Sequence, residues 1–226
     1  MGTSTPSKSN LDVQAVYRNR FATTSGRRAR VWRVLTSEFF QQWVSPQHSV
    51  LDFGAGYCDF INNIRAGKKM ALDLNPSVID SANRDVECVV QDLLQEWQLP
   101  SQSVDVAFSS NFLEHLPSKD GVLHCLSEAH RVLRRGGRLV LLGPNIRFCN
   151  QEYWNFFDHH LPLSDKSVEE ALILSGFEPS VVIDRFLPFT MQNNAPSHPA
   201  IVSAYLRLRP AWKIFGKQFL LVATRV

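Results

Sequence analysis

Ser49-Val50-Leu51-Asp52-Phe53-Gly54-Ala55-Gly56-Tyr57-Cys58 is the stretch of sequence that decides the fold of this chain. Its apolar half predicts a buried strand, and Asp52 lies near the end of that strand, before a glycine turn. Gly54 and Gly56 permit backbone torsions that a side chain would forbid, and they let a ligand lie against bare peptide. A helix is predicted to follow over residues 59–65. The stretch therefore predicts a ligand-binding turn between a strand and a helix.

Strand and helix patterns alternate through most of the chain. Apolar runs predict strands at residues 49–53, 69–72, 86–90, 103–108, 138–142, 181–186 and 218–224. Helices are predicted at residues 11–21, 27–43, 59–65, 121–133, 167–175 and 200–214, the last with a break at Pro210. A short helix is opened by Pro76, and Gly136-Gly137 ends the helix at 121–133. This alternation predicts an α/β, Rossmann-like fold, in which a mostly parallel sheet has helices on both faces and binds ligands beyond its strand ends.

Length and composition favour one globular domain. The chain has 226 residues, 44% of them hydrophobic, and a formal net charge of +3. We expect a disordered tail at residues 1–10 and a single domain at 11–226, with an N-terminal helical cap and a lid around 146–166. So small a charge argues against nucleic-acid binding, and the basic cluster at residues 27–30 is expected to be a solvated helix face. The four cysteines lack CxxC spacing, so reduced thiols are expected. No apolar run is long enough to span a membrane, and a cytoplasmic protein is expected.

Acidic and amide residues follow the predicted strands where ligands bind. Asp52 and Asp73 suit a ligand with a ribose and a charged amino-acid end, and Asp73 is placed to accept hydrogen bonds from both ribose hydroxyls. Asp92, after the next strand, can accept a hydrogen bond from the exocyclic amine of adenine. A nicotinamide dinucleotide is disfavoured because Asp59 stands where its fingerprint has a third glycine, and a carboxylate there would repel pyrophosphate.

Several segments resemble class I S-adenosylmethionine-dependent methyltransferases of the type 11 small-molecule branch. They are the stretches at residues 50–56, 71–76, 91–93, 104–116 and 128–139. The resemblance implies a seven-stranded sheet whose last strand is antiparallel, and S-adenosyl-L-methionine as the cofactor. Cys58 departs from the family, which commonly has a third glycine there. The cofactor site that these patterns predict, together with the preceding helix, consists of Tyr17, Arg20, Asp52, Gly54, Ala55, Gly56, Asp73, Leu74, Asp92, Leu93 and Asn111.

Three histidines are candidates for a general base that deprotonates an acceptor hydroxyl: His115, His159 and His160. His115 follows the fourth strand beside Glu114, and the alternative is that this pair only packs or caps. His159 and His160 lie in an aromatic segment, residues 148–163, which suits a lid over the acceptor or a cluster that closes the core. No metal site is expected, because side chains of adjacent histidines diverge in extended backbone.

These patterns predict methyl transfer to a small molecule or a sugar, with O-methylation favoured. A sugar is suggested by the segments at 185–190 and 215–220, which look similar to methyltransferases associated with glycosyltransferases. The alternative is a module that binds S-adenosylmethionine or a nucleoside without catalysis. The stretch at 205–219 mixes basic and aromatic residues, so a weak contact with a membrane surface is also expected.

Overall fold

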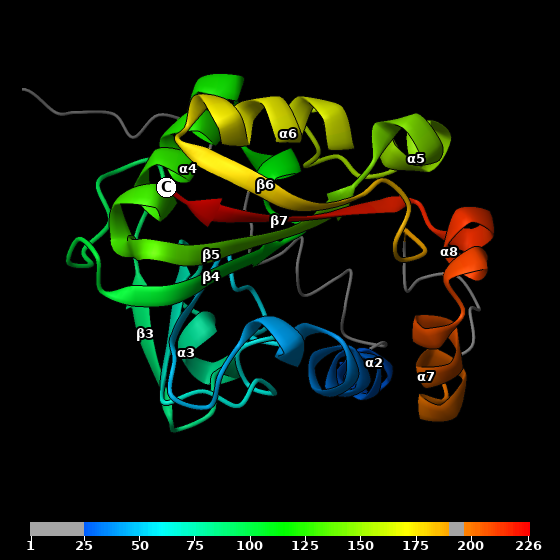
Figure 1. Cartoon of the computed structure of the whole chain (residues 1–226), viewed down its shortest axis with the longest axis horizontal. Helices are drawn as coiled ribbons and strands as arrows, with labels where there is room; N and C mark the ends of the chain where they lie inside the picture. The colour runs from blue at the N-terminus through cyan, green and yellow to red at the C-terminus, as the bar shows by residue number, and fades with distance from the viewer. Residues whose placement is uncertain (1–24, 190–196) are drawn as a thin grey trace, which may run out of the picture.

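A single sheet of seven strands organises the computed structural model, which describes residues 25–189 and 197–226. The strands lie in the order β3-β2-β1-β4-β5-β7-β6, and β7 is antiparallel to both of its neighbours. The predicted Rossmann-like architecture is therefore confirmed, including the antiparallel last strand (Figure 1). The strands are β1 (Ser49–Phe53), β2 (Lys68–Asp73), β3 (Val86–Val90), β4 (Val104–Ser110), β5 (Leu133–Pro144), β6 (Phe177–Ile183) and β7 (Gln218–Arg225).

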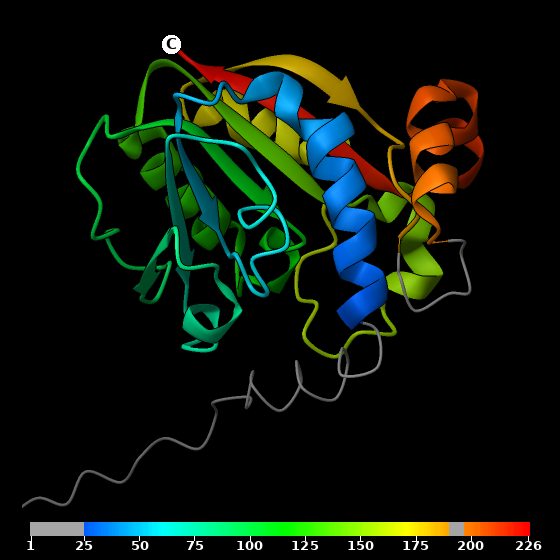
Figure 2. The ribbon, with the colours of Figure 1, turned by 90° about the horizontal axis from the view of Figure 1, so that it is seen from below.

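Helices cover both faces of the sheet. On one face lie α4 (Lys119–Val132) and α6 (Asp165–Leu174), and on the other lie α2 (Ser25–Glu38), α3 (Val78–Ser81) and, at the edge of the molecule, α7 (Pro199–Arg207) (Figures 1 and 2). Each face buries its own apolar cluster: Leu126 of α4 packs with Leu51, whereas Leu35 of α2 packs with Val50. Successive strand residues point to opposite faces, so one strand supplies both cores.

Four short elements complete the described chain. They are η1 (Phe40–Trp43), η2 (Leu113–His115), α5 (Ile146–Tyr153) and α8 (Arg209–Phe215). The predicted helix at 27–43 is thus two elements, and the one at 200–214 breaks at Leu208, just before α8 with Pro210 in its first turn. No helix in the described ranges combines the length and the apolar character needed to cross a membrane.

The prediction was wrong at several places. Residues 59–65 form turns and not a helix. The Asn63 side chain donates to the Asp59 carbonyl within the segment, and the Asn62 side chain donates to the carbonyl of Ser81. Helix α4 ends before the glycine pair, which lies inside β5, where Gly136 adopts a φ of +74°. Strand β6 begins at Phe177, because the preceding Gly176 turns the chain directly into pairing with β7. Helix α5 lies in a stretch where the sequence showed no periodicity.

The predicted tail at 1–10 and helix at 11–21, which carries Tyr17 and Arg20, lie outside the described residues.

Candidate active site

The site lies where the strand order reverses. Strands β1 and β4 are parallel neighbours, and from them the chain proceeds toward opposite edges of the sheet. Ligands of open α/β sheets bind in the crevice beyond the strand ends at such a point. The glycine turn follows β1 here, and Ser110-Asn111 ends β4. The residues that the sequence analysis selected at these two strand ends are therefore brought together.

The glycine turn is held in shape by Asp73 at the end of β2. Gly54 and Gly56 have φ angles of +65° and +51°, which glycine adopts without strain. The amide of Gly56 donates to Asp73 Oδ2 at 2.8 Å, and the amide of Asn75 donates to Asp73 Oδ1 at 2.8 Å. At Gly54 a Cβ atom would lie 2.4 Å from the Phe112 ring. Gly54 is thus also needed for packing against Phe112, a reason that the sequence analysis did not include beside backbone torsion and ligand contact.

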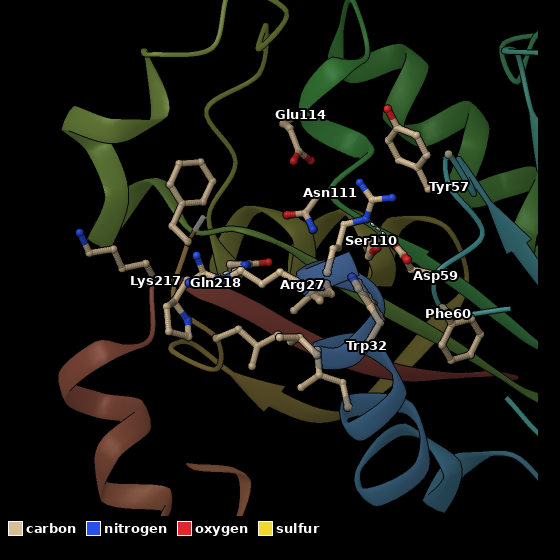
Figure 3. Close-up of a pocket in the computed structure, with 18 of the residues that line it drawn as sticks. Arg27, Trp32, Tyr57, Asp59, Phe60, Ser110, Asn111, Glu114, Lys217 and Gln218 are labelled. Carbon is tan, nitrogen blue, oxygen red and sulfur yellow. Dashed lines mark hydrogen bonds and ion pairs between the residues drawn. The ribbon is translucent and has the colours of Figure 1, made fainter. Parts of the chain in front are cut away.

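A cavity of about 780 Å³ opens above these strand ends (Figure 3). Its wall combines the glycine turn, the end of β4, α2, the segment after α5, and α7. Of the predicted site residues, those that line the cavity are Asp52, Gly54, Ala55, Gly56, Asn111, His115 and His159. One space therefore joins the predicted cofactor turn to two of the three predicted bases.

The cavity wall fits the charged end of S-adenosylmethionine. Asp52 is 3% exposed and lines the cavity, and no described cationic side chain pairs with it. Burial raises the pKa of Asp52 well above its usual range, and a hydrogen bond from the backbone amide of Ile61 opposes that rise. A buried carboxyl group without a cation is costly, so a ligand ammonium such as that of the methionine portion would stabilise it.

Four predicted cofactor residues lie outside the cavity wall. Asp73 is half-buried with both oxygens on backbone amides, and burial raises its pKa, whereas Leu74 and Asp92 are exposed near the ends of β2 and β3. The Leu93 side chain packs in the core below. A ribose and an adenine would have to reach these strand ends from the cavity, and their contacts with Asp73 and Asp92 remain predictions.

The basic cluster at residues 27–30 is not the solvated face that was expected. Arg28 forms an ion pair with Asp59, its guanidinium lies 3.9 Å above the centre of the Tyr57 ring, and its side chain is 11% exposed. Arg27 and Arg28 both line the cavity (Figure 3). Burial raises the pKa of Asp59, and the charge of Arg28 opposes that rise. The amphipathic pattern of α2 gave no signal for this, because the partner is 31 residues away.

Three ionisable side chains gather on the side of the cavity that faces α5. Glu114, His115 and His159, called the acceptor cluster below, have donor atoms that all lie within 4.8 Å of one another. Glu114 is 3% exposed and points into the cavity (Figure 3). Burial raises the pKa of Glu114 to about 7, and the charge of His115 opposes the rise. The sequence analysis left open whether Glu114 and His115 only pack or cap, and the structure places both in the cavity wall beside His159.

The backbone of residues 158–161 clamps this cluster. His115 Nδ1 lies 2.9 Å from the carbonyl oxygen of Asp158 and 3.3 Å from its Oδ2. Two acceptors at Nδ1 favour the tautomer with its proton there, which leaves Nε2 with a lone pair. The amides of His160 and Leu161 both donate to the Glu114 carbonyl. His160 itself is exposed and does not line the cavity, so the structure does not bring it to the other two histidines.

The predicted lid divides into a buried and an exposed part. Phe156 stacks on His159 with ring centres 4.8 Å apart, and both line the cavity. Tyr153 is fully buried and its hydroxyl donates to the Leu161 carbonyl. Trp154 and Phe157 are 59% and 83% exposed and do not line it. Of these aromatic side chains, Phe156 is therefore the one placed to contact an acceptor.

Residues from the end of the chain also reach the cavity. Gln218 is 7% exposed, its Nε2 donates to the Pro188 carbonyl at 2.8 Å, and its Oε1 has no partner within the described ranges. Lys217 pairs with Glu152, and both line the same wall. The sequence analysis placed these residues at the start of a strand and in the stretches 215–220 and 205–219. It did not place them in the cavity, because that depends on the pairing of β7 with β5.

Comparisons with known proteins agree with this geometry. Residues 51–141 match the family described as the methyltransferase domain. A sequence comparison with curated proteins finds no match. A SAM-dependent methyltransferase from Archaeoglobus fulgidus has a similar structure, at a TM-score of 0.66 and 16% identity, over 95% of this chain and 100% of that one.

Two further solved structures share the fold. An S-adenosylmethionine-dependent methyltransferase from Mesorhizobium loti gives a TM-score of 0.57 at 19% identity, over 79% of this chain and 91% of that one. The geranyl diphosphate C-methyltransferase of Streptomyces coelicolor A3(2), in complex with Mg²⁺, geranyl diphosphate and S-adenosyl-L-homocysteine, gives 0.61 at 16% identity, over 98% and 85%.

Proposed function

We propose that this chain, which has the class I fold and whose residues 51–141 match the methyltransferase domain, transfers the methyl group of S-adenosylmethionine to an oxygen atom of a small-molecule or sugar acceptor. The observation that carries this proposal is the shared cavity, in which the glycine turn and the acceptor cluster face the same space. A module that only binds the cofactor would have no use for buried ionisable groups beyond the cofactor turn. The cavity volume of about 780 Å³ is in the range of small-molecule sites.

The residues around the cavity divide the work of the reaction. Asp52 and the turn Gly54–Gly56 would hold the methionine portion, and Asp73 would hold the ribose while it shapes the turn. The bound cofactor supplies a methyl group on a positively charged sulfur. The acceptor cluster would bind the acceptor hydroxyl, and the hydroxyl would lose its proton beside these side chains. Holding the oxygen in line with the methyl group can supply about 7–11 kcal/mol.

Aromatic side chains close the acceptor side of the cavity. Phe156 and Phe189 pack edge to face with ring centres 5.6 Å apart, and both line the wall. Flat apolar rings suit the faces of sugars and planar acceptors, and they exclude the water that would compete with the acceptor.

The four cysteines are free thiols, which supports placing the reaction in the reducing cytoplasm.

The acceptor also has an apolar part in this proposal. Ile201 and Phe215 line the cavity and are 49% and 58% exposed, so an apolar path leads from the wall to the outside. Ile214 and Leu208, in and next to α8, are also exposed, at 67% and 58%. Helix α8, which carries Ile214 and Phe215, also carries Arg209 and Lys213 and contains no acidic residue. A basic and apolar helix of this kind supports a weak contact with an anionic membrane surface.

The test combines cofactor binding with an acceptor screen. Calorimetry should show one S-adenosylmethionine bound per chain, and release of S-adenosylhomocysteine should identify an acceptor among free sugars, sugar nucleotides and phenols. Mass spectrometry of the product should then locate the new methyl group on oxygen. A methyl group on nitrogen or carbon would refute O-methylation, and cofactor binding without turnover on any class would favour the binding module.

The membrane contact has its own measurement. Co-sedimentation with vesicles of phosphatidylcholine containing phosphatidylglycerol should exceed that with phosphatidylcholine alone, and Phe215→Ser with Ile214→Ser should remove the difference. Lys166→Glu, on α6 away from this face, is the matched charge control. Equal sedimentation of the wild type with both vesicles would end this part of the proposal.

A further inference from the structure

The acceptor cluster has the composition of a metal site. Its three donor groups come from η2 and from the segment after α5, and their donor atoms all lie within 4.8 Å of one another. Two imidazoles and one carboxylate form a donor set that suits zinc, iron, cobalt or manganese in the divalent state. No metal site was expected from the neighbouring His159 and His160, whereas the fold brings His159 next to Glu114 and His115.

Within the part of the chain that the structure describes, no lysine or arginine forms an ion pair with Glu114. Its carboxylate is buried beside the cavity, and two cations of the same wall are engaged by other acids, Lys217 by Glu152 and Arg28 by Asp59. Among the described residues, the charged or ionisable groups that act on it are His115 and Asp158, of which the second is another acid. Burying a carboxylate is costly unless a cation or hydrogen-bond donors compensate for it. A bound cation would provide that compensation.

His115 already has the support that metal-binding histidines require. Metal ligands of this type usually donate their other ring N–H to a carboxylate or a carbonyl, which orients the ring. Asp158 offers both groups to His115 Nδ1, at 2.9 Å for its carbonyl and 3.3 Å for Oδ2. Nε2 is therefore the ring nitrogen that remains for an ion.

We propose that Glu114, His115 and His159 bind one divalent transition-metal ion, which holds the acceptor oxygen beside the cofactor. Three protein ligands leave further coordination positions open, and the cavity gives an acceptor access to them. Binding to the ion weakens the O–H bond of the acceptor, as it does for metal-bound water. The proton goes to solvent, and the oxygen keeps the electron pair. That pair forms the new bond to the methyl carbon, and the carbon–sulfur bond breaks with its electrons left on sulfur.

This inference rests on the proposed function for its chemistry, but ion binding is measurable without turnover. The chelator-treated protein is titrated with ZnCl₂, MnCl₂ or CoCl₂ by calorimetry, and Co²⁺ binding is followed by its visible absorption. One ion per chain is expected. Glu114→Gln and His159→Gln should each weaken binding by more than about tenfold, and Asp158→Asn should weaken it about 10–100-fold through His115.

Matched controls separate ligand loss from damage to the fold. His160→Gln changes the neighbouring exposed histidine, and Glu152→Gln changes another carboxylate in the same wall; both should bind the ion as the wild type does. Each variant is checked by circular dichroism and by S-adenosylmethionine affinity. Equal loss of the ion in His160→Gln and His159→Gln would overturn the assignment. Methyl transfer at full rate in chelator would refute the metal site but leave the proposed function intact. Ion binding without any turnover would support the metal site but count against the proposed function.

Discussion

The dependence of stability on pH should distinguish Glu114 from the other carboxyl groups of the chain. Burial raises its pKa from 4.5 to about 7. Between these two values the folded protein holds a proton on Glu114 that the unfolded chain releases. The folded state therefore binds more protons, and the free energy of unfolding falls as the pH rises through this window. Above about pH 7 this loss of unfolding free energy is complete, and below pH 4.5 it is absent.

The size of the effect follows from the same two values. One pKa unit corresponds to about 1.36 kcal/mol, so a rise from 4.5 to about 7 amounts to about 3 kcal/mol. Glu114→Gln removes the titrating group and should remove this part of the pH dependence. For a chain of this size, about 2–4 °C of melting temperature correspond to 1 kcal/mol. Between pH 4.5 and pH 8, the melting temperature of the wild type should therefore fall by roughly 6–12 °C more than that of Glu114→Gln.

The assay is denaturant unfolding at several pH values in the presence of a chelator, so that no ion compensates the carboxylate. Wild type, Glu114→Gln and Glu152→Gln are compared. Glu152 is paired with Lys217, which lowers its pKa, so its variant should keep the wild-type slope between pH 5 and pH 8. Parallel curves for the wild type and Glu114→Gln would refute the reasoning, because they would mean that Glu114 titrates alike in the folded and unfolded chains.

Three further predictions follow from single contacts. Asp73→Ala removes the acceptor of the Gly56 amide, and hydrogen bonds to charged groups contribute about 1.5–3 kcal/mol each. The S-adenosylmethionine affinity measured by calorimetry should therefore fall tenfold or more, and an unchanged affinity would remove Asp73 from the site. Phe156→Ala should raise the acceptor KM in steady-state assays, whereas the exposed Trp154→Ala should not, and the reverse order would move the acceptor outside the cavity. Arg28→Ala should lower the free energy of unfolding by about 1.5–3 kcal/mol, because the partly buried Asp59 loses a charged hydrogen-bond partner. Adding Asp59→Ala should restore part of the loss, and losses that simply add would contradict the ion pair.

The sequence by itself determined the architecture of the sheet and the place of the ligand turn. Apolar runs that end in acids, separated by helical spacing, specify parallel strands, because only a parallel sheet buries both faces of such runs. Strands β1 to β4 were predicted to within about two residues, and Asp52, Gly56 and Asn111 were selected at the strand ends that meet in the cavity. These features are local, so neighbouring residues carry enough information to specify them.

The tertiary structure alone decided the chemistry of the acceptor side. His115 and Asp158 meet across 43 residues, and Arg28 meets Asp59 across 31. No periodicity records such pairs, because they arise only when the ends of β4 and the segment after α5 are brought to one edge of the sheet. The start of β6 was likewise misplaced because pairing with β7, and not local propensity, decides where that strand begins. The pattern of the chain determines which strand ends form the site, and long-range packing determines which side chains act there.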